Sequence, residues 1–145
     1  MTLTRILVLL LPLMAAGCDD TISGPSGTSS STTINTVPLT ESFEATLSPG
    51  GSSFYSFSVT TAGTAAVTLA SVVQSGRAAA LSIPLRISLG TPAGEGCAVS
   101  DSVQATPALT PQLTAALSVG IHCVLVEDVG QVTGSVIAAV RFSHL

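Results

Sequence analysis

Residues 43–59, FEATLSPGGSSFYSFSV, contain the clearest indication of the fold in this sequence. On both sides of the centre, apolar residues alternate with polar ones, which is typical of a β-strand with one buried face. Ser48 to Gly51 combine a proline that pre-sets φ with two glycines that accept positive φ. The stretch therefore predicts two strands separated by a tight turn, with Tyr55, Phe57 and Val59 on one face of the second strand.

The same alternation recurs in short runs to the end of the chain. Further strands are predicted at residues 65–73, 85–89, 97–103, 113–117, 121–126 and 132–142. Because residues 121–126 are almost continuously apolar, they predict a central strand covered on both faces. We predict an all-β fold, a jelly-roll-like antiparallel β-sandwich of seven to eight strands.

The segments between these runs are rich in turn residues. Loops or turns are predicted at residues 90–96, 106–111 and 127–131. Residues 77–81, RAAAL, favour a helical turn, which Pro84 would end.

The first 18 residues, MTLTRILVLLLPLMAAGC, have the layout of an export signal. Arg5 precedes an apolar run that is shorter than the ~20 residues a membrane span needs. The small residues Ala15-Ala16-Gly17 followed by a cysteine resemble the lipobox of bacterial lipoproteins, with Ala15 where that family prefers Leu. The resemblance implies cleavage before Cys18 and acylation of Cys18, for example with palmitate. Cleavage by an ordinary signal peptidase, which leaves Cys18 as a free thiol, is the alternative.

Composition divides the chain into three parts. Residues 1–17 are the predicted signal peptide, and residues 18–37 are the lipidated cysteine with a Ser/Thr/Gly-rich linker that buries too little apolar surface to fold. A linker of this length would hold the domain about 25 Å from the membrane. Residues 38–145 are the predicted sandwich. The lipid anchor places the protein in the cell envelope, and the sequence leaves the outer membrane and the periplasmic face of the inner membrane both open.

Charge excludes several classes of partner. The chain has no Lys, charged residues are 8% of it, and its formal net charge is −4. Removal of residues 1–17 takes away Arg5 and makes the charge more negative still. This composition excludes a basic footprint for nucleic acid and a polybasic membrane patch.

The two remaining cysteines, Cys97 and Cys123, belong to an exported chain, and export exposes thiols to an oxidising compartment. We predict a Cys97–Cys123 disulfide, which would close a loop of roughly 25 residues and stabilise the fold by ~3 kcal/mol. Two buried free thiols are the alternative. No Cys-x-x-Cys or paired-His spacing points to a metal site.

Several strand motifs follow one another in the predicted domain. They are the Gly-rich turn with YSFSV (residues 55–59), GTAAVTL (63–69), LRISL (85–89), GIHCVLV (120–126) and GSVIAAV (134–140). Together they resemble the bacterial pre-peptidase C-terminal domain, a jelly-roll-like sandwich of exported proteins. Two departures are that residues 82–84, SIP, stand where the family often has Asp, and that His122 and Val136 replace tyrosines. The resemblance implies a module that accompanies a secreted enzyme.

No catalytic constellation is present in the sequence. His122 and Cys123 are adjacent in a strand, so their side chains point to opposite faces, and His144 is expected to be a solvated terminal residue. Glu127 and Asp128, with Glu95 and Asp101 in other loops, are the candidates for a Ca²⁺ site, and solvated turn carboxylates are the alternative. Phe54 is out of step with the predicted core face and is the candidate exposed aromatic. We expect no catalytic residues, cofactor or metal.

These observations predict a membrane-anchored lipoprotein. Its sandwich would be a non-catalytic module that binds another envelope protein or a glycan. The alternatives are an accessory subunit of a secreted protease or export system, and a small periplasmic enzyme or inhibitor.

Overall fold

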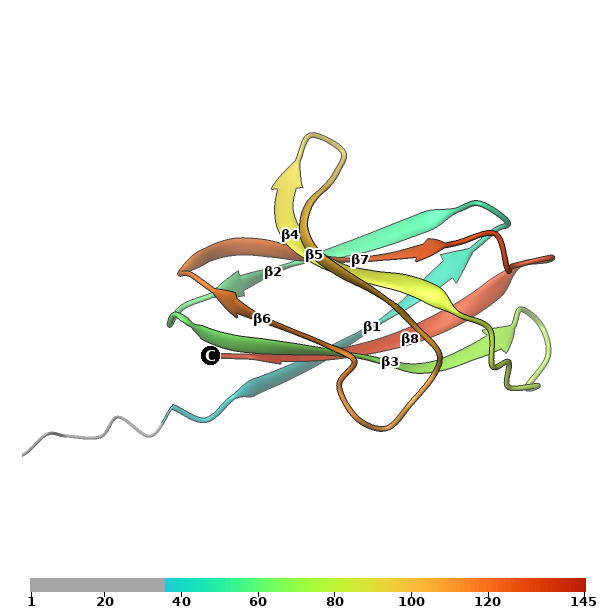
Figure 1. Ribbon diagram of the computed structural model, residues 1–145, viewed down its shortest axis with the longest axis horizontal. Helices are drawn as coiled ribbons and strands as arrows, with labels where there is room; N and C mark the ends of the chain where they lie inside the picture. The colour runs from blue at the N-terminus through green and yellow to red at the C-terminus, as the bar shows by residue number, and fades with distance from the viewer. Residues whose placement is uncertain (1–35) are drawn as a thin grey trace, which may run out of the picture. The chain divides into compact units, whose positions relative to one another are not determined.

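A computed structural model of the chain describes residues 36–145 (Figure 1). Cys18, the predicted signal and nearly all of the predicted linker lie outside the described residues. The described part holds eight strands and no helix: β1 (Leu39–Leu47), β2 (Ser52–Val59), β3 (Gly63–Gln74), β4 (Leu85–Ala93), β5 (Gly96–Ala105), β6 (Leu113–Leu117), β7 (Gly120–Asp128) and β8 (Val136–His144). In residues 36–145 there is consequently no helix that could span a membrane.

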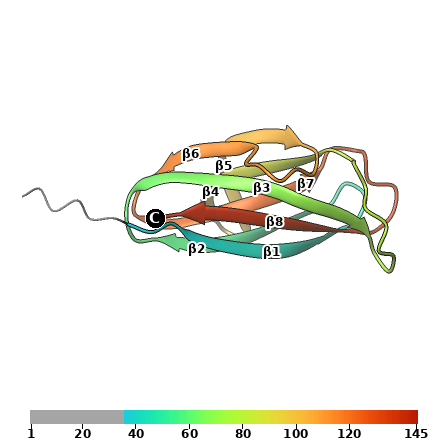
Figure 2. The same ribbon diagram turned by 90° about the horizontal axis from the view of Figure 1, so that it is seen from below.

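The strands form two antiparallel sheets that pack face to face (Figure 2). The first sheet has the order β1-β8-β3-β6 and the second sheet has the order β2-β7-β4-β5. Eight strands connected in this order form a jelly roll. The predicted antiparallel sandwich is therefore confirmed, and β1 begins one residue after the predicted boundary at Pro38.

The turn at residues 48–51 passes the chain from one sheet to the other. Gly50 has a φ of 70°, and the Gly51 N–H donates a 2.8 Å hydrogen bond to the Ser48 carbonyl. β1 and β2 thus lie in different sheets, where both are edge strands on the same side of the sandwich. The prediction of two strands separated by a tight turn is confirmed.

The core lies between the two sheets and consists mainly of Val, Leu, Ile and Ala side chains that alternate along each strand. Burying one such side chain is worth roughly 1.5–3 kcal/mol. The largest fully buried side chains are Phe142, Leu47, Leu69, Leu85, Ile87, Leu89, Val59, Val67, Val72, Val124, Val126 and Val140.

Aromatic rings close the side of the sandwich where β1 and β2 are edge strands. Phe142 of β8 lies 4.7 Å from Phe57 and 5.8 Å from Tyr55, measured between ring centroids. Phe43 of β1 stacks on Tyr55 at 5.5 Å. Pairs at such distances stabilise by about 0.5–1.5 kcal/mol beyond their buried area. Tyr55 is on the predicted face, but its ring lies at the rim and remains 38% exposed.

The helical turn predicted at residues 77–81 is wrong. After a turn at Gly76, Ala80 forms an antiparallel bridge with Val73, and the Leu81 N–H donates to the Val72 carbonyl at 2.8 Å. β6 pairs only with residues 63–67 of β3, so the part of β3 beyond Leu69 has no partner strand on the side away from β8. Residues 80–81 take up those free backbone groups, which outweighs the helix propensity of Ala and Leu.

The loop predicted at residues 90–96 is also wrong. β4 continues to Ala93, only Gly94 and Glu95 form the turn, and β5 starts at Gly96. A Cβ atom on Gly90 would lie 2.0 Å from the Ala98 carbonyl oxygen, so glycine is needed for the strands to approach this closely. The turn predicted at residues 127–131 likewise begins late, because β7 runs through Asp128.

Candidate functional site

The outer face of the second sheet carries apolar side chains that do not belong to the core. Phe54 of β2 pairs directly with Leu125 of β7, and both side chains point away from the first sheet. Ile121, four residues before Leu125 on the same face of β7, is 56% exposed, and Phe54 is 38% exposed. Val99 of β5 points to the same face, since it pairs with Gly90 opposite Cys123. We call Phe54, Val99, Ile121 and Leu125 the apolar patch.

This face corrects one expectation and supports another. The strand 121–126 is central, but its outer face is only partly covered, because Ile121 is exposed and Leu125 is half-buried. Phe54 is exposed, as its position out of step with the core face predicts. The apolar run in β7 therefore serves the core on one face and the apolar patch on the other.

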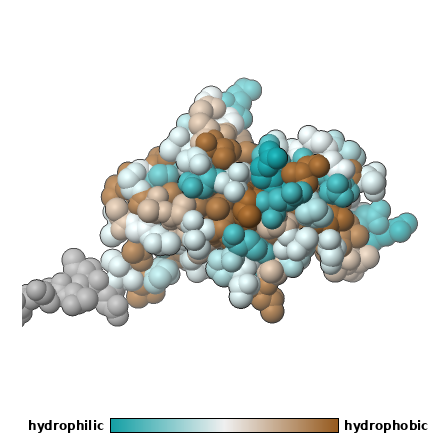
Figure 3. Space-filling model, viewed as in Figure 1, coloured by the Kyte–Doolittle hydropathy of each residue, from teal (hydrophilic) through white to brown (hydrophobic). Residues whose placement is uncertain are grey.

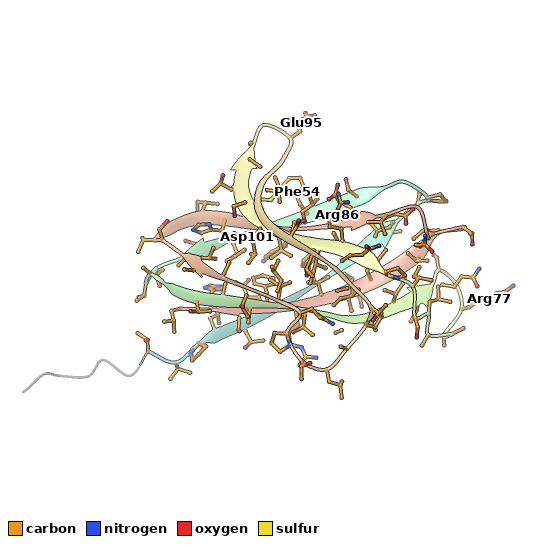
Figure 4. All side chains as sticks on the ribbon, viewed as in Figure 1. Phe54, Arg77, Arg86, Glu95 and Asp101 are labelled. Atoms are coloured by element: carbon orange, nitrogen blue, oxygen red, sulfur yellow. A yellow bond between two sulfur atoms is a disulfide. The ribbon has the colours of Figure 1, made fainter. Side chains whose placement is uncertain are left out.

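A hairpin arm stands beside the apolar patch. The last pair between β4 and β7 is Gly90 with Cys123, and beyond it β4 and β5 continue as a separate two-stranded arm, residues 90–99 (Figure 1). Pro92 lacks an N–H group to donate to another strand, which is consistent with β7 pairing ending before it. Glu95 lies at the tip of the arm, and Phe54 lies near its base (Figure 4).

The predicted disulfide is confirmed, and it fixes the arm to the sheet. Cys97 of the arm bonds to Cys123 of β7, with 6.0 Å between their Cα atoms. Cys123 is fully buried although it points to the outer face. Without the bond, the arm would be held to the domain only through its two strands, because beyond Gly90 no third strand of residues 36–145 pairs with it.

Polar groups surround the apolar patch. Arg86 of β4 lies 3.8 Å from the Glu127 carboxylate, and both side chains are partly exposed. Ser88, which pairs with Leu125, is fully buried, and its hydroxyl has no hydrogen-bond partner within residues 36–145. A buried hydroxyl without a partner is unfavourable by about 1–3 kcal/mol, so the fold tolerates rather than requires it.

Asp128, a calcium candidate in the sequence, holds two loops together. One carboxylate oxygen accepts a 2.8 Å hydrogen bond from the Gly50 N–H, and the other accepts from the N–H groups of residues 130, 131 and 132 at 2.8–3.0 Å. These donors, above all Gly50, hold the pKa of Asp128 below its usual value. These N–H groups already bond to both Asp128 carboxylate oxygens, which a cation would need as ligands. The Glu127 carboxylate faces Arg86 and not Asp128.

The described residues contain no group of three or more His, Cys, Asp or Glu side chains placed to hold a metal ion. Glu95 lies at the arm's tip and Asp101 further down β5 (Figure 4). Asp101 pairs with Leu89 of β4, whereas Asp128 pairs with Leu85, four residues away along that strand. Calcium binding at Glu127 and Asp128 stays a prediction. Within residues 36–145, no third carboxylate, His or Cys lies close enough to them to complete a site.

The two histidines lie in different environments. His122 is buried, with Nε2 2.8 Å from the Ser118 carbonyl oxygen, while Cys123 points to the opposite face. The prediction that these neighbours point apart is confirmed. His144 is only 3% exposed, so its expected solvation is wrong.

His144 is buried because β8 continues to this residue and pairs it with Leu39 of β1. Its ring lies 4.8 Å from Phe57, and its Nε2 lies 2.9 Å from the Glu41 carboxylate. Tyr55 donates to the other oxygen of Glu41 at 3.2 Å. No local sequence pattern predicts this contact, because Glu41 and His144 are 103 residues apart.

Two small pockets lie away from the apolar patch, and neither is lined by a carboxylate. Sequence reasoning missed the arm altogether; its signal was Gly94, the turn residue between two short apolar runs. Comparison of the chain with protein-family models and with curated proteins found no match.

Proposed function

We propose that this chain is a membrane-anchored bacterial lipoprotein whose sandwich is a non-catalytic module that binds another protein of the cell envelope. The N-terminal signal with Cys18 and the Ser/Thr/Gly-rich linker support the anchor. The Cys97–Cys123 disulfide fits export, because disulfides persist in oxidising compartments. The resemblance to the pre-peptidase C-terminal domain fits an accessory role beside a secreted enzyme.

The apolar patch is the observation that carries the binding role. A two-layer sandwich needs apolar residues on its inner faces, and these are already supplied by the core. Phe54, Ile121 and Val99 point outward and are 38–56% exposed, beside an arm that a disulfide holds in place. Several exposed apolar side chains on one sheet face, with polar neighbours, are typical of interaction sites, and the pinned arm lowers the entropy lost on binding.

A protein is the favoured partner because of the chemistry of the patch. Three of its four side chains are aliphatic, which suits the core of a protein interface. The exposed ring of Phe54 and the serines beside it on β2 favour the alternative, a glycan that stacks on the ring.

Site-specific photo-crosslinking in intact cells tests this proposal. Ser56 of β2 points outward from the second sheet and Thr46 of β1 points outward from the first sheet, so they are a matched pair of exposed hydroxyl residues. We expect a photoreactive amino acid at position 56 to give one discrete protein adduct and the same group at position 46 to give none. The adduct should disappear in an Ile121→Asp variant.

Equal labelling from both positions would exclude a binding face on the second sheet. An adduct from position 56 that persists in the Ile121→Asp variant would exclude the apolar patch as its cause. Absence of any protein adduct, together with retention on immobilised envelope glycan that Phe54→Ser abolishes, would replace the protein partner with a glycan.

A further inference from the structure

The outer face of the first sheet holds a pocket of about 160 Å³, on the opposite side of the sandwich from the apolar patch. Its lining combines one cation, several hydroxyl groups and an apolar wall. The residues that matter are Arg141, Thr40, Thr68, Ser143, Leu109 and Pro111. A cavity of this size is comparable to one that holds a benzene molecule.

Arg141 provides the charge of the pocket and has no carboxylate partner in it. The strand register places Arg141 of β8 between Ser42 of β1 and Thr68 of β3. Glu44 is the next outward residue of β1, yet no Glu or Asp oxygen of residues 36–145 lies within 4.0 Å of the Arg141 guanidinium. Its five N–H donors are therefore available to a ligand.

Thr68 provides a second, independent sign of a ligand. The residue is only 6% exposed, and its hydroxyl makes no hydrogen bond to any group of residues 36–145. Among residues 36–145, Ser88 has the only side-chain hydroxyl that is both fully inaccessible and without a hydrogen-bond partner. The unpartnered Thr68 hydroxyl is therefore accessible, and the pocket that Thr68 lines is the space it faces. A buried hydroxyl in this position gains a partner when the pocket is filled.

The apolar wall is fixed before any ligand arrives. Residues 106–112 form a loop whose Ala108 N–H donates to the Leu69 carbonyl and whose Gln112 N–H donates to the Val67 carbonyl, both at 3.0 Å. The Gln112 side chain also accepts from the Leu69 N–H at 2.9 Å and donates to the Thr106 carbonyl at 3.0 Å.

These bonds lock the loop against β3 and present Leu109, 89% exposed, at the pocket's edge. The tip of this loop projects from the domain and is hydrophobic (Figure 3). A prearranged apolar wall lowers the entropy lost when a ligand binds.

We propose that this pocket binds a small carboxylate ligand, with the carboxylate on Arg141 and Thr68 and a short aliphatic group against Leu109 and Pro111. A guanidinium fork matches a carboxylate in two parallel hydrogen bonds. The pocket has one cationic side chain, Arg141, and the chain has a net charge of −4, so a singly charged anion is favoured over phosphate. The proposal is independent of the lipid anchor and of the apolar patch.

The chemistry has two sources, a free branched-chain acid and the C-terminal end of a peptide. Ligand-observed NMR titration of the purified full chain distinguishes them, with isovalerate as the free acid and N-acetyl-leucine as the peptide end. The neutral isovaleramide and inorganic phosphate are the comparison probes. We expect at least one of the two acids to bind roughly tenfold or more tightly than isovaleramide, the scale of a charge-assisted contact.

Matched arginine variants locate the site. Arg141→Gln should weaken acid binding at least about tenfold, whereas Arg77→Gln should leave it unchanged, because Arg77 lies in the turn beyond the end of β3 (Figure 4). Thr68→Val, which removes only the hydroxyl, should weaken binding several-fold. Circular dichroism confirms that each variant is folded.

Three results would overturn the proposal. They are equal binding of isovalerate and isovaleramide, equal losses in the Arg141→Gln and Arg77→Gln variants, and no binding of either acid. Binding of phosphate alone would mean an adventitious ion only. If one acid binds and the other does not, the proposal stands and the source is assigned.

Discussion

The two outer faces of the sandwich differ although the two inner faces are alike. Both sheets contribute alternating Val, Leu, Ile and Ala to one shared core. Outward, the central strand β8 of the first sheet presents Ile137, Ala139, Arg141 and Ser143, whereas the central strand β7 of the second sheet presents Ile121, Cys123, Leu125 and Glu127. The first face holds a pocket with a cation and hydroxyl groups, and the second carries the exposed side chains of Phe54 and Ile121 beside a pinned arm.

The difference shows which residues the fold requires. Outward apolar groups contribute little to a two-layer core, so stability alone does not account for Phe54 and Ile121, which are 38% and 56% exposed. The apolar patch and the arm therefore call for an explanation outside folding, and binding is the one we propose.

The largest effect is expected from a matched pair of phenylalanines. Phe142 is 1% exposed and contacts four aromatic rings, whereas Phe54 is 38% exposed on the outer face. Phe142→Ala should lower the free energy of unfolding by about 3–5 kcal/mol, and Phe54→Ala by less than about 1 kcal/mol. Urea denaturation measures both. Similar losses would mean that Phe54 is a core residue and not part of a binding face.

Removal of the disulfide should act on one face only. The double variant Cys97→Ala/Cys123→Ala should lose about 3 kcal/mol of stability, the value expected for a loop of this length. Amide hydrogen exchange should rise most in the arm, residues 90–99, and little in β1 and β8, because the bond ties only the arm to β7. Uniform exchange throughout both sheets would show that the bond supports the whole sandwich instead.

Acid should weaken the loops that Asp128 joins. Its folded-state pKa lies below the ordinary value of 3.8, mainly through the Gly50 N–H. A lowered folded-state pKa adds stability that is complete above the unfolded-state pKa and is lost as the pH falls through the folded-state value. Asp128→Asn should therefore destabilise the protein at pH 7 and flatten the loss of stability below about pH 4.

Asp101→Asn is the control for this prediction, because within residues 36–145 the Asp101 carboxylate accepts a hydrogen bond only from the neighbouring Ser100 hydroxyl. Unfolding of both variants followed across pH gives the comparison. Identical profiles for Asp128→Asn and the parent protein would contradict the assigned role.

Much of the inner architecture could be predicted from the sequence. The alternation of apolar and polar residues in 43–59 and 113–117 identified strands, because a period of two places every second side chain on the buried face of a sheet. The outer architecture could not be predicted in the same way. The length of β4 depends on Gly90 meeting the Ala98 carbonyl, and the bridge at Ala80 depends on how short β6 is.

The candidate site was predicted in part. Phe54 and the disulfide could be inferred, because one residue was out of step and two cysteines stood in an exported chain. The pocket at Arg141 could not, since its groups come from β1, β3, β8 and the loop 106–112 and meet only through the strand register. The burial of His144 was missed for the same reason.

The smallest effect is expected from a matched pair of serines. The Ser88 hydroxyl is buried and has no hydrogen-bond partner within residues 36–145, whereas the single Ser100 hydroxyl hydrogen has two acceptors, the Asp101 carboxylate at 2.9 Å and the Leu89 carbonyl at 3.2 Å. Ser88→Ala should leave stability unchanged or raise it by about 1 kcal/mol, and Ser100→Ala should lower it by a similar amount or less. Thermal unfolding detects either shift. A marked loss in Ser88→Ala would reveal a polar partner for that hydroxyl.

Export and anchoring underlie the proposed function, and intact-mass analysis of the native protein, before and after reduction, tests them most directly. The account predicts a chain that starts at Cys18, carries acyl groups, and lacks two hydrogens until the Cys97–Cys123 bond is reduced. A native chain that retains Met1 and has three reduced thiols would contradict it.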